Sequence, residues 1–138
     1  MYLDNAATTK IHPEVLKEMI NAYNENLVNY NALYYDDAIR TKDRINSCYD
    51  KVREILNFND DQEIVFTSGA TESNNYILRG IIEKNLDKHF ITSSIEHKSI
   101  LEVFKFYAGK GVDVTFVMPN EKGVIEATAI ESDIKENT

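Results

Sequence analysis

The residues with the clearest chemical potential surround Gly69 in a polar connection, Thr67–Asn74 (Thr-Ser-Gly-Ala-Thr-Glu-Ser-Asn). This connection follows an apolar, β-branched segment and leads into a helical pattern. Glycine permits a tight turn, and the unpaired N–H groups at the start of a helix bind phosphate. The hydroxyls of Ser68, Thr71 and Ser73 add donors. The alternative is structural: Ser68 or Thr71 caps the helix, since the turn lacks the lysine of a P-loop.

A second polar connection, Thr92–Lys98 (Thr-Ser-Ser-Ile-Glu-His-Lys), places His97 just beyond the end of a predicted strand. There an imidazole can stack on a flat ligand or exchange protons near neutral pH. The alternative is that His97 is a surface or capping residue. The Ser93-x-x-Glu96 spacing fits a capping box, which predicts a structural role for Glu96.

The elements that must position these connections alternate between strand and helix. The apolar patterns predict strands over residues 63–67, 90–92 and 112–116, and helices over residues 71–83, 97–108 and 127–135. This order predicts the α/β class, with an open, mainly parallel sheet and flanking helices. Successive parallel strands end at the same edge, so we expect the two connections to lie side by side. A phosphate cup beside a histidine suits a flat phosphorylated cofactor.

Two features of the helices lead to further expectations. The apolar set of helix 71–83 is wide enough to predict burial on more than one side. Before the sheet, residues 1–60 form a predicted helical arm, which divides the chain into 1–60 and 61–138. Its first helix begins near Pro13, with His12 expected as the cap, and its second carries apolar residues from Ile45 to Leu56. Cys48 falls on the apolar face of that second helix, which predicts a buried structural thiol.

Bulk composition restricts the classes of partner and compartment. The chain has 138 residues, a formal net charge of −8 and 43% hydrophobic residues, which is ordinary for a globular protein. The negative charge argues against nucleic acid and anionic membrane surfaces as partners. No apolar run is long enough to span a bilayer, and the single cysteine excludes an internal disulfide. We therefore expect a cytoplasmic protein, and we assign no metal ligands.

Three segments closely resemble the cysteine desulfurases, which are class V, fold-type I pyridoxal-phosphate enzymes. They are Tyr2–Thr9, Glu63–Asn74 and Ile91–Lys98, and they occur in the family's order and spacing. Val112–Gly123 resembles the strand and turn that follow. The resemblance implies that residues 61–138 are part of a pyridoxal-phosphate-binding α/β domain, the fold-type I large domain. It also implies an N-terminal strand at the start of the arm.

The resemblance implies functional roles for seven residues. The phosphate cup corresponds to Gly69, Ala70 and Thr71. His97 corresponds to the catalytic histidine that stacks on the pyridine ring of the cofactor and handles protons. The N-terminal strand that passes near the substrate corresponds to Asn5, Ala6 and Ala7. The chain departs from the family's pattern at Asn29–Asp37, where many desulfurases have a glycine- and serine-rich stretch.

The activity implied by the resemblance is conversion of L-cysteine, or a similar amino acid, to L-alanine. Sulfur passes to an enzyme cysteine as a persulfide, and serves iron–sulfur cluster assembly or tRNA thiolation. Full-length members form homodimers and transfer sulfur to an acceptor or scaffold protein. The family's cofactor-binding lysine lies beyond the matching segments, so we expect this chain alone to be inactive. The alternatives are another class V activity (selenocysteine lyase, aminotransferase or carbon–sulfur lyase) and a non-catalytic module that depends on a partner.

Overall fold

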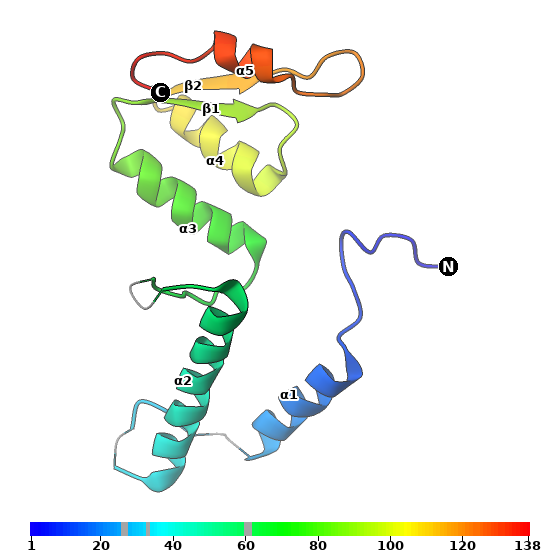
Figure 1. Ribbon diagram of the computed structural model, residues 1–138, viewed down its shortest axis with the longest axis vertical. Helices are drawn as coiled ribbons and strands as arrows, with labels where there is room; N and C mark the ends of the chain where they lie inside the picture. Colours follow the sequence, from blue (N-terminus) through cyan, green and yellow to red (C-terminus); the bar gives the residue numbers. More distant parts are fainter. Residues whose placement is uncertain (26–27, 33, 60–61) are drawn as a thin grey trace. The chain divides into compact units, whose positions relative to one another are not determined.

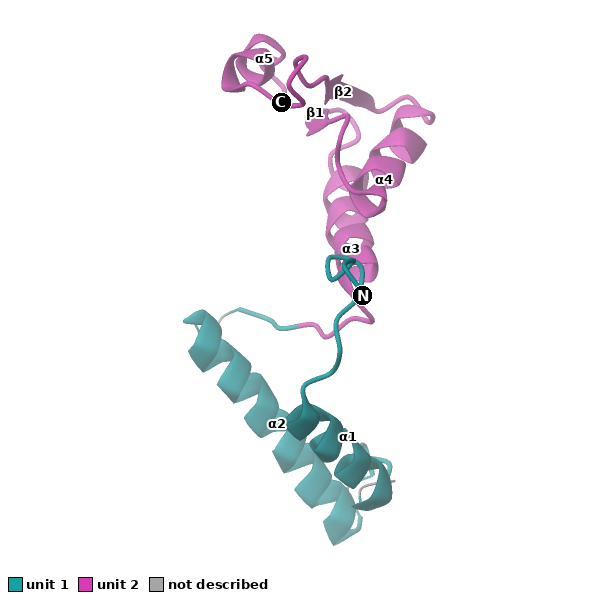
Figure 2. Ribbon diagram, turned by 90° about the vertical axis from the view of Figure 1, so that its right-hand side faces the viewer, with its two compact units in different colours: residues 1–64 teal, residues 65–138 magenta. Residues whose placement is uncertain are grey.

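The computed structural model describes residues 1–25, 28–32, 34–59 and 62–138. Within these ranges the chain forms two compact units, Met1–Ile64 and Val65–Thr138 (Figure 2). The boundary predicted from the sequence lies between residues 60 and 61, which are outside the described residues. The division into 1–60 and 61–138 therefore stays a prediction.

The first unit contains two amphipathic helices, α1 (Pro13–Glu25) and α2 (Asp36–Leu56). The backbone N–H of Glu14 donates to Nδ1 of His12 over 3.4 Å, so His12 caps α1 as predicted. An ion pair of 3.2 Å between Arg44 and Glu18 joins the two helices. α2 begins well before Ile45, because the acidic Asp36 and Asp37 stabilise the positive end of the helix.

Two predictions for the first unit are wrong. Cys48 is exposed rather than buried, because the buried position of α2 is Ala38, near the start of the helix. The N-terminal segment forms no strand. Residues 5–7 instead make a turn, in which the N–H groups of Ala7 and Thr8 donate to the carbonyl of Asp4 over 3.1 and 3.3 Å. A strand needs a hydrogen-bonding neighbour, and the described residues of this unit include no other strand.

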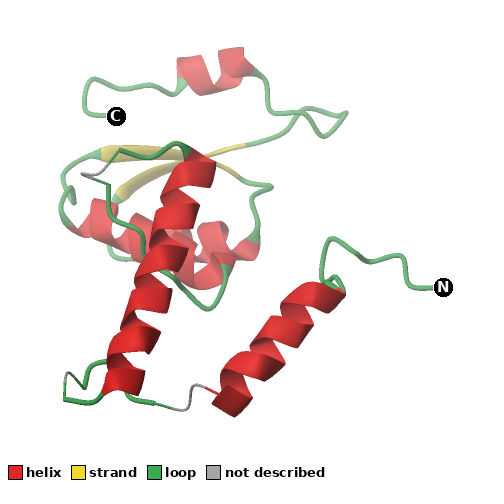
Figure 3. Ribbon diagram, turned by 60° about the horizontal axis from the view of Figure 1, so that its bottom comes forward, coloured by secondary structure: helices red, strands yellow, loops and turns green. Residues whose placement is uncertain are grey.

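The second unit is an α/β layer structure, as predicted. Its elements are α3 (Ala70–Glu83), β1 (His89–Ser93), α4 (Lys98–Ala108), β2 (Asp113–Val117) and α5 (Ala127–Ser132). β1 and β2 pair in parallel, with His89 opposite Asp113 and Ser93 opposite Val117 (Figure 3). α4 lies against one face of the sheet and α5 lies over the other (Figure 1).

The core of this unit lies between α3, α4 and the sheet. Its buried members are Ile82, Val103, Phe104, Tyr107 and Val112, and the side chains of Leu78, Phe90, Ile100, Val114 and Phe116 pack around them. The predicted alternation in the last strand is thus confirmed, since Val114 and Phe116 face the core. The Tyr107 hydroxyl donates to the Glu83 carboxylate over 2.5 Å, and this bond fixes α3 to α4 and raises the pKa of Tyr107.

The strand predicted over residues 63–67 does not form. This segment is irregular, and the side chains of Val65 and Phe66 are exposed. The described part of the chain has a two-stranded sheet, β1-β2, and it offers this segment no strand to pair with. β propensity takes effect through pairing and packing with a neighbouring strand, so it does not by itself produce a strand here.

The prediction that α3 would be buried on more than one side is also wrong. Ile82 is fully buried and Leu78 partly buried against the core, but Tyr76, Ile77 and Ile81 are exposed. The reason is that α4 is the main element that packs against α3 within the described second unit.

Candidate functional site

The start of α3 presents backbone donors without a side-chain cap. Its N-cap is Gly69, and within the described residues no side chain makes a capping hydrogen bond there. The first N–H groups of a helix have no partner inside the helix, so those of Ala70 and Thr71 remain available to a ligand. Gly69 has a φ of +156°, which L side chains rarely adopt, so the turn requires glycine. The alternative in which Ser68 or Thr71 caps this helix is wrong.

The polar side chains before α3 stabilise the turn. The Thr67 and Ser73 hydroxyls are 2.7 Å apart, and the Thr67 hydroxyl donates to the Gly69 carbonyl over 3.2 Å. The Glu72 carboxylate accepts from the backbone N–H of Ser68 over 2.6 Å and from the Ser68 hydroxyl over 2.7 Å. These two bonds, the backbone bond first, lower the pKa of Glu72. The hydroxyls of Ser68 and Ser73 therefore stabilise the turn itself. The hydroxyl at the helix start that can serve a ligand is that of Thr71.

The lowered pKa of Glu72 predicts a pH dependence of stability. The folded-state pKa lies below the unfolded value of about 4.3, so the contribution is complete above that value. It is lost as the pH falls through the folded-state pKa. We expect Glu72→Gln to lower the urea midpoint of the second unit at neutral pH and to match the wild type in strong acid. Exposed Glu121 supplies the control, Glu121→Gln. A midpoint difference that persists unchanged into strong acid would contradict this assignment.

The start of α4 is capped by His97. Nδ1 of His97 accepts the backbone N–H of Ser99 over 3.1 Å, and it lies 2.8 Å from the Ser99 hydroxyl. The capping alternative for His97 is therefore confirmed, and the residue remains exposed to solvent. The capping box predicted for Ser93 and Glu96 is wrong. The helix begins after His97, and the Ser93 hydroxyl donates instead to the Glu96 side chain over 2.8 Å.

Thr71 and His97 line the same cavity, of about 670 Å³, between α3 and α4. A hydrogen bond of 2.8 Å from the Asn74 amide to the Ser99 hydroxyl joins the second turn of α3 to the first turn of α4. Along the cavity, Arg79 lies 5.2 Å from the centre of the Phe106 ring. The donor set fits a flat phosphorylated ring. Backbone N–H groups and a hydroxyl suit a phosphate, and an exposed imidazole suits an aromatic ring.

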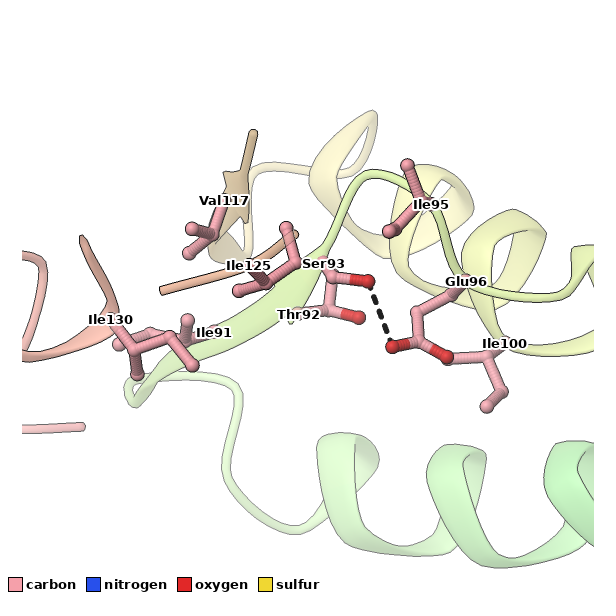
Figure 4. A pocket seen from close by; sticks show the side chains of 9 residues that line it. All are labelled: Ile91, Thr92, Ser93, Ile95, Glu96, Ile100, Val117, Ile125 and Ile130. Atoms are coloured by element: carbon pink, nitrogen blue, oxygen red, sulfur yellow. Dashed lines mark hydrogen bonds between the residues drawn. The ribbon is translucent and has the colours of Figure 1, made fainter. Parts of the chain in front are cut away.

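A second cavity, of about 620 Å³, opens at the carboxyl end of β1 (Figure 4). Its walls are mostly apolar, with Ile91 and Val117 from the strands and Ile130 from α5 among them. The bonded pair of Ser93 and Glu96 lies at its rim. This cavity does not include Thr71 or His97, so its apolar lining lies outside the predicted phosphate cup.

The structure brings some predicted site residues together and separates others by unit. Gly69, Ala70 and Thr71 form the start of α3, and His97 lines the same cavity as Thr71. Asn5, Ala6 and Ala7 lie in the turn of the first unit, and their role near the substrate stays a prediction.

Sequence reasoning overlooked the bridge between Asn74 and Ser99 and the clamp formed by Glu72. The glutamate three residues after the helix cap was a usable signal, since that position reaches back to the preceding backbone. Nothing local marked Ser99 as the partner of Asn74, because that contact depends on how two helices pack.

Comparison with known proteins agrees with this geometry. The family described as aminotransferase class-V matches residues 1–138, the whole chain. The chain belongs to this family. Membership confirms the resemblance noted in the sequence and the partial fold-type I architecture.

Several relatives named cysteine desulfurase IscS are similar over the full length of the chain. A cysteine desulfurase IscS from Buchnera aphidicola is 36% identical over 147 residues, and one from Clostridium botulinum (strain Kyoto / Type A2) is 38% identical over 141. In both cases the chain is covered completely and spans 35% of the relative's length.

Two solved structures are similar to this chain in fold. A NifS-like protein has a TM-score of 0.88 at 36% identity, with 100% of this chain and 38% of that chain covered. SspA in complex with cysteine has a TM-score of 0.85 at 37% identity, with 99% of this chain and 40% of that chain covered.

Proposed function

We propose that this chain provides half of the cofactor site of a pyridoxal-phosphate-dependent cysteine desulfurase. The observation that carries the proposal is the shared cavity of Thr71 and His97 at the first turns of two packed helices. The reaction would convert L-cysteine to L-alanine and pass the sulfur to an enzyme cysteine. The similarity to relatives named cysteine desulfurase and to a structure solved with cysteine supports this choice within the class V family.

The chain's residues have distinct tasks in this proposal. The N–H groups of Ala70 and Thr71 and the Thr71 hydroxyl bind the cofactor's phosphate at the positive end of α3. His97 lies against the ring and presents Nε2 for proton transfer, because its Nδ1 is held at the start of α4. The bound cofactor supplies the electron-withdrawing ring that the desulfuration requires.

Further parts of the proposal concern the whole protein. The chain spans about 35% of the length of these two relatives. The proposed activity, the choice of substrate and the binding of partners therefore depend on residues outside these 138. We propose a cytoplasmic homodimer that hands sulfur to an acceptor or scaffold protein in iron–sulfur cluster assembly. The net charge of −8 supports the proposal that nucleic acid and membranes are not partners. Within the described residues, no helix combines the length and apolarity needed to cross a membrane.

Binding of pyridoxal phosphate by Thr71→Val tests the proposed cup. A hydrogen bond to a charged group contributes about 1.5–3 kcal/mol, so we expect the dissociation constant to rise roughly 10- to 100-fold. The measurement is titration followed by amide chemical shifts, with Thr128→Val as the matched control on exposed α5. Pyridoxal without its phosphate should not distinguish the wild type from Thr71→Val. Equal affinity of both proteins for pyridoxal phosphate would refute the cup.

A further inference from the structure

Two polar side chains, Ser99 and Asn74, lie in a row behind the exposed imidazole of His97. Ser99 is buried, with 6% of its surface exposed, and its hydroxyl contacts two groups. The Asn74 amide nitrogen donates to the Ser99 hydroxyl over 2.8 Å, and the same hydroxyl lies 2.8 Å from Nδ1 of His97. Buried hydroxyls are ordinarily fully hydrogen-bonded, so these contacts account for the position of Ser99.

The direction of these bonds follows from the groups involved. An amide NH₂ can only donate, so the Ser99 oxygen accepts from Asn74. The backbone N–H of Ser99 donates to Nδ1 of His97 over 3.1 Å, so this nitrogen is an acceptor. The Ser99 hydroxyl, 2.8 Å away, therefore directs its own proton to Nδ1. A ring nitrogen that accepts two hydrogen bonds carries no proton. The ring proton of neutral His97 is therefore on Nε2.

We propose that Asn74 and Ser99 are positioning residues that hold His97 as the Nε2–H tautomer, with that nitrogen left for a ligand in the cavity shared with Thr71. The inference rests on the proposed function, in which His97 meets the cofactor ring. Asn74 lies one turn after Thr71 in α3. The same bonds therefore fix the phosphate-binding helix relative to the histidine.

His12 provides an internal comparison. Its Nδ1 also accepts the N–H of the residue two positions later, over 3.4 Å, at the start of α1. Within the described residues, no side-chain hydroxyl or amide bonds to the ring of His12 as Ser99 does to the ring of His97. The two histidines thus share a capping geometry and differ in the added hydroxyl.

The test is the tautomer of His97, measured from the ¹⁵N shifts of both ring nitrogens in neutral to mildly alkaline buffer without ligand. We expect His97 to be more strongly biased to Nε2–H than His12. In Ser99→Ala the backbone N–H remains but the hydroxyl is lost, so the His97 ring shifts should converge toward those of His12. Ser99→Thr retains the hydroxyl and should restore the wild-type values.

Reversal of the polarity at Asn74 provides a second, independent variant. In Asn74→Asp the carboxylate accepts the Ser99 proton, so the hydroxyl oxygen turns a lone pair to Nδ1, and the Nδ1–H form of His97 should increase. Amide peaks of β1 and β2 report that each variant is folded. Unchanged His97 shifts in folded Ser99→Ala and Asn74→Asp would overturn the proposal, and if Asn74→Asp does not fold, the Ala and Thr variants decide. Because no ligand is present, this result is independent of cofactor binding at Thr71.

Discussion

Ile82→Ala is expected to lower the free energy of unfolding of the Val65–Thr138 unit by about 2–5 kcal/mol. Ile82 has no exposed surface, and it contacts the cluster formed by α3, α4 and Val112. Truncation leaves a cavity in a small core that the surrounding side chains fill only partly. The measurement is the loss of β1 and β2 amide peaks with increasing urea.

The adjacent isoleucine provides a matched control. Ile81 has 49% of its surface exposed on the same helix, so Ile81→Ala removes the same atoms with little loss of packing. Alanine also favours the helix. We expect its urea midpoint to stay close to that of the wild type. Equal losses for Ile81→Ala and Ile82→Ala would show that the core is not placed as described.

His89→Leu should destabilise the same unit by about 1–3 kcal/mol, since it removes the two hydrogen bonds of a buried imidazole. The Thr115 hydroxyl loses this partner, whereas the exposed Thr138 hydroxyl keeps the backbone N–H of Lys135. Both ring nitrogens of His89 are engaged, Nδ1 with the Thr138 hydroxyl and Nε2 with the Thr115 hydroxyl, each over 2.8 Å. The side chain is 2% exposed at the start of β1. Leucine fills the volume but supplies no donor or acceptor.

The same urea titration measures the effect of His89→Leu. Exposed His12 in the other unit supplies the control, because His12→Leu should leave the β1 and β2 midpoints unchanged. A second readout is local: the N–H of His89 donates to the Asn137 carbonyl over 3.1 Å, so residues 135–138 should exchange their amide protons faster in the variant. Wild-type exchange and an unchanged midpoint together would argue against this role.

The elements of the second unit could largely be predicted from local pattern. Gly109-Lys-Gly111 ends the predicted helix and α4 ends at Ala108, and the alternation of Val114 and Phe116 identifies β2. The segment 63–67 has equally strong β character yet stays irregular. Its state depends on a neighbouring strand, and local sequence carries no information about whether such a neighbour is present.

The sequence correctly predicted that Thr71 and His97 lie close together, but the predicted reason was only part of the cause. Thr71 and His97 were expected to meet because their connections would follow adjacent strands. They line one cavity because α3 and α4 pack, with Asn74 bonded to Ser99, although residues 63–67 lie outside the sheet. Helix packing involves residues that are 25 positions apart, and a single sequence does not show which of them touch.

Residue type alone predicted the wrong N-cap residues at the starts of two helices. Serine and threonine dominate at N-caps, which favoured Ser68, Thr71 and Ser93 as caps. The actual caps are Gly69 and His97, because the backbone turn and the imidazole nitrogen satisfy the geometry at those two positions. Because the cap of α3 is a glycine, no cap side chain occupies the first N–H groups of this helix, and they can meet an anion.

The packing order of the second unit bears on how it assembles. Its main packed pairs are α3 with α4, β1 with β2, and α4 with β2, and each joins elements that are adjacent or separated by a single element. Short sequence separations keep the entropy of loop closure small and favour rapid folding. A ribosome releases these elements in chain order, and each packs against one that is close in sequence, so this unit is suited to stepwise folding during synthesis. The turn before α3 can then form together with the core.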